Sequence, residues 1–391
     1  MANINRFAEM LPEITAWRRD LHENPELLFD CHRTAGVVAE KLKSFGVDEI
    51  KTGLGRTGLV GVIKGKSTAS GKVIGLRADM DALPMQETTG VEHASKVDGK
   101  MHACGHDGHT AMLLGAAKYL AETRNFDGTV VVIFQPAEEG GGGGKEMVDD
   151  GMMDIFGIQE VYGMHNMPTL PVGHFAIRPG PLMAATDQFD IYVEGKGGHA
   201  AMPHNTIDTT LVASQIVVAL QSIVGRNIDP LANVVISVTS FETESKTYNV
   251  IPQRVHIRGT CRTLTPEARD QSEAAIARVA AHTATAFGAT ARLEYERGYP
   301  VTKNHPEQTE FAVEVARALS GEQAVIDDVD PVMGGEDFSY MLEARPGAFI
   351  FAGNGDTAML HHPDYDFNDE MIPTGCSYWV KLAETRMPAS A

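Results

Sequence analysis

The sequence predicts an α/β protein in which a mixed, largely parallel sheet with helices on both faces is interrupted by a smaller α+β domain. Three observations lead to this prediction. The chain has 391 residues, and single hydrophobic cores stop growing at roughly 250–300 residues, so two domains are expected. Strand-like and helix-like segments alternate through the first part, which is typical of a parallel sheet. A different order follows over residues 187–296, where strand, helix, strand, strand, helix and strand succeed one another.

The first part opens with an amphipathic helix that Asn24-Pro25 ends and a second helix that Gly46 stops. The apolar run TVVVIF has the length and β-branched character of a strand buried on both faces. The predicted elements are helices over 5–22, 33–45 and 105–123, and strands over 58–64, 72–77, 129–134 and 161–164.

The pattern changes near Pro179-Gly180-Pro181 and changes back after Gly298-Tyr299-Pro300. Between them we predict strands over 187–194, 233–240, 253–262 and 290–296, with helices over 206–224 and 266–287. This order is that of a ferredoxin-like α+β sandwich. We therefore predict a first domain made of residues 1–183 and 298–391, with a helix-rich tail and a strand at 347–352, and an inserted domain of residues 184–297.

Composition and charge exclude several classes of protein. The net charge of −19 argues against nucleic acid, which requires clustered Lys and Arg to neutralise phosphates. The start MANINRFAEM lacks the features of a signal peptide, and no stretch approaches the roughly 18 apolar residues of a membrane span. The four irregularly spaced cysteines are then expected to be reduced thiols, and the expected location is the cytoplasm.

The segment HACGHDGH, residues 102–109, concentrates metal-ligand side chains just before a predicted helix. Cys104 and His106 can converge on one ion if Gly105 lets the backbone turn. A lone histidine here would fit better with an ordinary helix start capped by Asp107. The density of one Cys, three His and one Asp in eight residues favours a metal site instead.

Three further segments contribute ligand-type side chains. QPAEEG follows the TVVVIF strand and carries Glu138 and Glu139, of which one can bind metal while the other shuttles a proton. A surface acidic loop is the alternative for this pair. GMHN holds His165, which by itself would fit a core histidine. LHHP holds His361 and His362, and at most one of these neighbours is expected to be a ligand.

RADMDALP places Asp79 and Asp81 after a predicted strand. These carboxylates can orient a ligand histidine or a metal-held water, or they can simply form the turn around Pro84. Together the segments predict metal-dependent amide hydrolysis, since a metal both acidifies a water and polarises a carbonyl. Mixed Cys, His and carboxylate ligation suits Mn, Zn, Co or Ni.

The motifs RADMDALP, HACGHD, QPAEEG, GMHN, GGHAAMPH, NVIP, GGEDF and LHHP occur in the order found in the amidohydrolase branch of the two-metal aminoacylase/carboxypeptidase family. The chain resembles that branch over nearly its whole length. The branch includes hippurate hydrolases, N-acyl-amino-acid amidohydrolases and plant auxin-conjugate hydrolases. The resemblance implies hydrolysis of a small N-acyl amino acid to a carboxylic acid and a free amino acid.

The resemblance also implies a role for each motif residue. Two divalent metal ions per subunit would be bridged by Cys104, where many relatives use an Asp. The other ligands would be His106, Glu139, His165 and His361, with Glu138 as the general base. More distant members have a His where this chain has Asp79, so one of the two ions is expected to bind more weakly.

The inserted domain resembles the family's lid and dimerisation domain, which implies a homodimer or homotetramer. GGHAAMPH would place His199 near the scissile carbonyl, in cis or in the partner subunit. Asn249 in NVIP and Arg262 match positions that contact the substrate or stabilise the oxyanion.

Other hypotheses remain open at this point. A carboxypeptidase or dipeptidase would use the same metal site on short peptides. A cysteine hydrolase would use Cys104 as nucleophile and His106 as base, and a metal chelator would not inhibit its activity. A metal-binding or sensing protein without turnover would have no use for Glu138 beside its ligands.

Overall fold

The computed structural model describes residues 4–389 and consists of two compact units. The larger contains Met1–Leu182, Lys303–Asp330 and Asp337–Ala391, and the smaller contains Met183–Thr302 and Pro331–Glu336. The ends of the predicted first domain, residues 1–3 and 390–391, lie outside the described residues. The backbone N–H of Ala184 donates to the Gly334 carbonyl at 2.9 Å, which attaches the segment Pro331–Glu336 to the start of the smaller unit.

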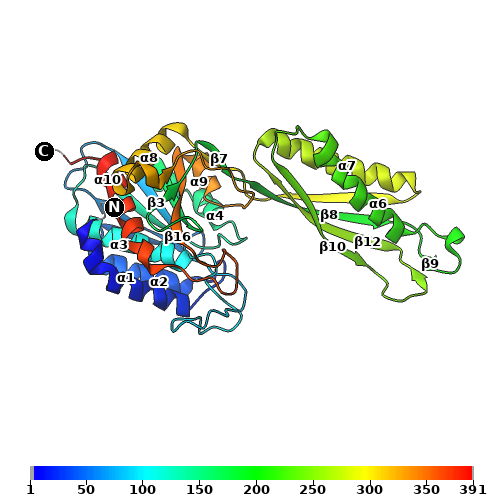
Figure 1. The fold of residues 1–391 in the computed structure, drawn as a ribbon, viewed down its shortest axis with the longest axis horizontal. Coiled ribbons are helices and arrows are strands. Elements are labelled where there is room, and N and C mark those ends of the chain that lie inside the picture. The colour runs from blue at the N-terminus through cyan, green and yellow to red at the C-terminus, as the bar shows by residue number, and fades with distance from the viewer. Residues whose placement is uncertain (1–3, 390–391) are drawn as a thin grey trace. The chain divides into compact units, whose positions relative to one another are not determined.

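The larger unit is built on an eight-stranded mixed sheet with the order β1-β2-β4-β3-β5-β16-β6-β15. Figure 1 labels two of its inner strands, β3 and β16. These strands are β1 (Glu49–Leu54), β2 (Gly58–Lys64), β3 (Val73–Asp79), β4 (Thr129–Gln135), β5 (Glu160–Pro168), β6 (Phe175–Ala176), β15 (Val325–Ile326) and β16 (Gly347–Gly355). Strands β4, β3, β5 and β16 are parallel neighbours, whereas β1 and β2 are antiparallel at one edge. The predicted α/β class with a largely parallel sheet is confirmed.

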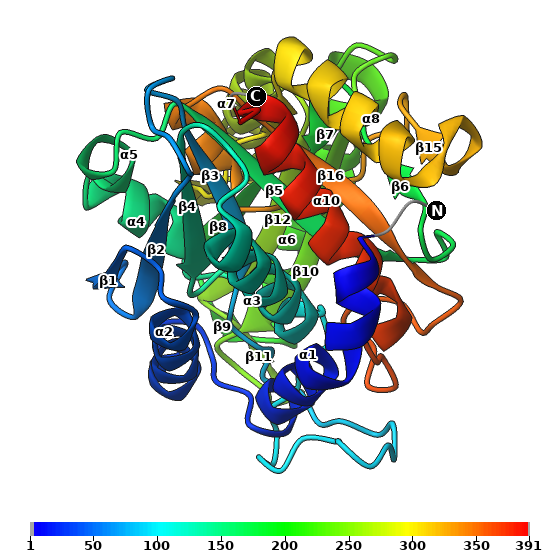
Figure 2. The same ribbon diagram turned by 90° about the vertical axis from the view of Figure 1, so that its left-hand side faces the viewer.

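Helices surround this sheet, and Figure 2 shows α1, α3 and α10 lying together on one side of it. The helices are α1 (Asn5–Glu23), α2 (His32–Phe45), α3 (His106–Thr123), α4 (Gly143–Asp149), α5 (Met152–Ile155), α8 (Pro306–Ser320), α9 (Ser339–Ala344) and α10 (Ile372–Arg386). Helix α1 is amphipathic as predicted, and its buried face includes Phe7, Met10 and Ile14. Gly46, in the left-handed conformation with φ of 74°, ends α2 as its sequence predicts.

Strand β4 is the centre of the core. It lies between β2 and β3 in the sheet, α3 and α4 pack against it, and its side chains from Val130 to Phe134 have no exposed area. We predicted that the apolar run TVVVIF forms a strand buried on both faces, and the structure confirms this. Strand β1 and the shortest strands were not predicted, because segments of two to six residues are too short to show a clear period.

The smaller unit has the predicted ferredoxin-like order of elements. Its sheet runs β10-β12-β8-β13, all antiparallel, and α6 and α7 cover one face (Figure 1). The elements are β8 (Ala185–Glu194), β9 (Gly198–His199), α6 (Thr209–Ser222), β10 (Val234–Thr243), β11 (Val250–Ile251), β12 (Arg254–Thr263), α7 (Pro266–Ala286) and β13 (Thr290–Arg297). Two connecting strands, β7 (Gly180–Met183) and β14 (Thr302–Asn304), pair with each other.

Helix α6 begins three residues later than predicted. The Asp208 side chain accepts hydrogen bonds from the backbone N–H of Thr210 (3.0 Å) and Leu211 (3.2 Å), and this cap sets the start of the helix. Thr209–Asn227 is the one helix within residues 4–389 that is long and apolar enough to cross a membrane. Its buried side chains, Ile216 and Leu220 among them, belong to the core of the smaller unit.

Ile133→Ala should destabilise the larger unit by about 2–5 kcal/mol, because it leaves a cavity in the fully buried strand β4. The two tryptophans, Trp17 and Trp379, both lie in the larger unit, so fluorescence during urea unfolding reports on that unit alone. Ile326→Ala, at a half-exposed position of β15, is the control and should change stability by at most about 0.5 kcal/mol. Equal effects of the two changes would contradict the assignment of the core.

Candidate metal centre

Ligand-type side chains gather at the carboxyl ends of neighbouring parallel strands. Strand β3 ends at Asp79, and β4 leads into Glu138 and Glu139. Strand β5 continues beyond the predicted residues 161–164, so His165 lies within the strand rather than after it. Because β4, β3 and β5 are adjacent and parallel, their carboxyl ends share one edge of the sheet, where ligands bind in open α/β folds.

The turn at Gly105 brings the HACGHD residues together. Gly105 has a φ of 89° at the start of α3, and a Cβ there would lie 2.6 Å from Asn166 Oδ1, so only glycine fits. With the chain turned at Gly105, the ligand atoms of Cys104, His106 and His165 lie within 4.8 Å of one another. Cys104 Sγ is 3.4 Å from His165 Nε2.

Of the further groups of ligand atoms that overlap with the first, two contain the remaining predicted residues. Cys104, Glu139 and His361 form one, and His361 Nε2 lies 3.4 Å from Glu139 Oε1. His106, Glu138 and Glu139 form the other, again within 4.8 Å. Since these groups share members, the structure brings all five predicted ligands and Glu138 into one continuous site.

The chemistry of this donor set fits a metal. His106 Nε2 and Glu139 Oε1 are buried and have no hydrogen-bond partner within the described part of the chain, and they are 3.9 Å apart. Buried polar atoms without partners are costly, so they mark a site where something else binds. A divalent cation held by these atoms and the Cys104 thiolate would satisfy them.

The charges at the site also favour a cation. Burial by itself lowers the pKa of His106, but the Asp79 carboxylate and its neighbours outweigh this effect, so the pKa of His106 lies at about 10. Burial raises the pKa of the Cys104 thiol well above its usual range, and Glu139 adds to the rise. A metal that binds at neutral pH therefore displaces protons from both side chains.

Asp81 links the two glutamates to a ligand histidine. Its carboxylate accepts hydrogen bonds from the backbone N–H of Glu138 (2.9 Å) and Glu139 (3.1 Å). Its backbone carbonyl lies 2.8 Å from His106 Nδ1, which directs His106 Nε2 toward the site.

Asp79 is engaged on both sides by residues that the sequence analysis did not assign. Arg77 Nη1 donates to Asp79 Oδ2 at 2.8 Å, and His109 Nδ1 lies 2.6 Å from Asp79 Oδ1. His109 Nε2 in turn is 2.7 Å from Asn166 Oδ1, next to His165. Two signals could have identified them: His109 follows His106 by one helical turn, and Arg77 is a charged residue inside an apolar strand.

The remaining predicted residues belong to the smaller unit. His199 is exposed in β9 and pairs with Val250 of β11, so that it lies close to Asn249. Arg262 lies apart from them in β12, where it is half-buried and burial lowers its pKa. The roles of these three residues toward the metal centre stay predictions.

Comparison with known proteins extends these observations. Residues 75–385 match peptidase family M20/M25/M40. The chain is 42% identical to hippurate hydrolase of Campylobacter jejuni, over 97% of this chain and 98% of the relative. It is 41% identical to N-acetylcysteine deacetylase of Bacillus subtilis, over 94% of each. It is also 42% identical to thermostable carboxypeptidase 2 of Saccharolobus solfataricus, over 90% and 89%.

A solved structure leads to the same group of proteins. A Bacillus subtilis protein described as a dinuclear metal binding peptidase from the M20 family superposes with a TM-score of 0.84 and 36% identity, over 97% of this chain and 99% of that one. The resemblance inferred from the motifs is confirmed by these matches. The chain belongs to peptidase family M20/M25/M40.

Proposed function

We propose that this chain is a metal-dependent amidohydrolase that cleaves N-acyl amino acids to a carboxylic acid and a free amino acid. The observation that carries the proposal is the convergence of five ligand-type side chains beside Glu138. The relatives named hippurate hydrolase and N-acetylcysteine deacetylase support an acyl amino acid as substrate. The carboxypeptidase relative favours a second candidate, cleavage of short peptides at the same site.

Two divalent cations, Mn, Zn, Co or Ni, would occupy the site. The groups Cys104–His106–His165 and Cys104–Glu139–His361 share Cys104, which supports this residue as the bridging ligand. A shared ligand role also argues against Cys104 as a nucleophile. When bound, the cations would polarise the substrate carbonyl and lower the pKa of the attacking water.

Glu138 would act as the general base. Its backbone is held by Asp81, and its carboxylate lies among the ligands without belonging to the predicted set. It would take a proton from the attacking water while the oxygen adds to the acyl carbon, and then give that proton to the leaving amine nitrogen. His199 would donate to the developing oxyanion, and Asn249 and Arg262 would contact the substrate.

A second copy of the chain would bind through the smaller unit. Most of the exposed large apolar side chains among residues 4–389 belong to that unit, including Leu211 and Val218 on α6 and Val235 and Phe241 on β10. Strand β10 is also an edge strand, so its outer side can pair with another strand. Both features support a homodimer, or a homotetramer built from it. For location we propose the cytoplasm, where the four free cysteines would stay reduced.

Purified enzyme loaded with Mn, Zn, Co or Ni should release the amino acid from hippurate or from N-acetyl amino acids. Chelation with EDTA should abolish this activity, and adding the metal back should restore it, because the metal supplies the attacking water. Activity that survives EDTA would favour the cysteine hydrolase. Faster cleavage of dipeptides than of every acyl amino acid would favour the peptidase, and metal binding without any turnover would favour a binding protein.

The neighbouring glutamates should respond in different ways to the same substitution. Glu138→Gln should keep two metal equivalents and lower kcat about 100- to 10,000-fold, because a general base is lost. Glu139→Gln should lose metal, as Cys104→Ala should, because a ligand is lost. Metal content by mass spectrometry and steady-state kinetics distinguish the outcomes. Full activity of Glu138→Gln would remove its assignment as base.

Val218→Glu should convert the assembly to monomers, because it places a charge on the apolar face of α6. Light scattering after size-exclusion chromatography measures the change in mass. Ile155→Glu is the matched control, since Ile155 is 62% exposed against 66% for Val218 but belongs to the larger unit. An assembly that keeps its mass with Val218→Glu would contradict the proposed interface.

A further inference from the structure

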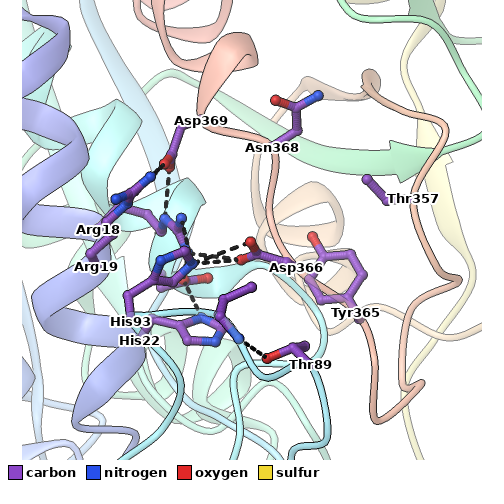
Figure 3. Close-up of polar contacts among 12 residues, drawn as sticks. Arg18, Arg19, His22, Thr89, His93, Thr357, Tyr365, Asp366, Asn368 and Asp369 are labelled. Carbon is purple, nitrogen blue, oxygen red and sulfur yellow. Dashed lines mark hydrogen bonds and ion pairs between the residues drawn. The ribbon is translucent and has the colours of Figure 1, made fainter.

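Arg18 is a fully buried cation on α1, far in sequence from the metal motifs, and no part of the proposed reaction uses it. Its guanidinium contacts three carboxylates. Nε donates to Asp369 Oδ1 at 2.8 Å, and Nη1 lies 3.1 Å from Asp366 Oδ1 (Figure 3). Nη1 also lies 3.5 Å from Asp107 Oδ2. A buried charge is tolerated only when such partners compensate it. The fork of the guanidinium therefore holds three separate points of the chain at fixed distances.

These points belong to the segments that carry the proposed ligands. Asp107 directly follows His106 at the start of α3. Asp366 lies on the loop that follows His361, and Asp369 begins the short 3-10 helix Asp369–Met371 between that loop and α10. Arg18 thus connects the beginning of the ligand set in the sequence with its end.

Two buried histidines extend the contacts of Arg18. His22 Nδ1 lies 2.8 Å from Asp107 Oδ2. Burial lowers the pKa of His22, but the neighbouring Asp107 carboxylate outweighs this effect, so that the pKa is raised to about 9. His93 Nε2 lies 3.1 Å from Asp366 Oδ1 and 3.2 Å from Arg18 Nη2 (Figure 3). A histidine therefore contacts the carboxylate at each end of the connection that Arg18 makes: His22 contacts Asp107, and His93 contacts Asp366.

The His361 segment needs such a restraint. His361 has a φ of 63°, a left-handed conformation that costs a non-glycine residue about 1–2 kcal/mol. Its side chain is 54% exposed, so packing contributes little to its position. The nearby backbone is attached at His361 N–H, which donates to the Ala103 carbonyl at 2.8 Å, and at Pro363, whose carbonyl accepts from Thr88 N–H at 2.9 Å.

We propose that Arg18 is a positioning residue of the metal centre, which sets the His361 loop against the His106 end of α3 so that both histidines reach the same pair of cations. The inference rests on the proposed function for the identity of the ligands. It goes beyond that function by assigning part of metal affinity to a residue that touches no ligand. Partners outside the ligand set commonly control metal affinity in this way.

The test compares adjacent arginines. Arg18→Met removes the buried fork, whereas Arg19→Met removes a neighbour that binds the other oxygen of Asp369 from the exposed side at 3.0 Å. Chelator competition on the folded apoprotein should show about 10- to 100-fold weaker binding of at least one cation for Arg18→Met. Arg19→Met should match the parent. With Co²⁺ bound, the d–d absorption bands of Arg18→Met should shift, because His361 no longer holds its place in the coordination shell.

Unfolding followed by tryptophan fluorescence separates positioning from stability. A purely structural Arg18 would lower the unfolding midpoint while the folded variant keeps the parent's metal affinity and Co²⁺ spectrum, and that result would overturn the proposal. If Arg18→Met does not fold, Asp366→Asn provides the second measurement, since Asp366 is 30% exposed and keeps its shape as Asn. Asp366→Asn should lower the affinity for the same cation, and an affinity equal to that of the parent would also overturn the proposal.

Metal binding by the parent protein distinguishes a failure of the positioning role of Arg18 from a failure of the proposed function. If the parent binds no divalent cation, the metal centre itself is wrong. If the parent binds two cations and Arg18→Met binds both equally well, only the positioning role is wrong.

Discussion

Gly105 adopts a left-handed conformation in a space where a Cβ atom would collide with Asn166 Oδ1 and the Tyr365 hydroxyl. This close approach lets the chain reverse between Cys104 and the first residue of α3, so that a thiol and an imidazole two positions apart face the same point. Every other contribution to the site is arranged around that turn. The strands β3 and β5 supply the neighbouring side chains, and His361 is attached to Ala103 just before it.

The site also depends on how buried charge is balanced. Carboxylates of Asp79, Asp81, Glu138 and Glu139 lie close together with little or no exposure, an arrangement that repels itself unless cations compensate it. Protein cations provide part of the compensation, as Arg77 does for Asp79. The remaining negative charge and the unpartnered atoms of His106 and Glu139 are what make bound divalent metal the consistent interpretation.

Much of the site could be predicted because its residues occur as dense local motifs. HACGHDGH directly precedes a predicted helix and QPAEEG directly follows a buried apolar strand, so their positions at the edge of a parallel sheet could be expected. Arg18, Arg77 and His109 were not assigned. Their contacts join residues that are 89, 260 and 57 positions apart, as Arg18 to Asp107, Arg77 to Asp337 and His109 to Asn166. A charged residue on an amphipathic helix gives no sign in the sequence that it will be fully buried.

The sequence by itself determined the class of the fold, the order of the longer predicted strands and helices, and the identity of the ligand-type side chains, because periodicity and motif density are local properties. Only the tertiary structure decided that Cys104 belongs to two ligand groups at once and that His109 lies between Asp79 and Asn166. It also decided that the strained His361 loop is fastened to α1 through Arg18. These features depend on distances between distant segments, and packing sets such distances after the local structure has formed.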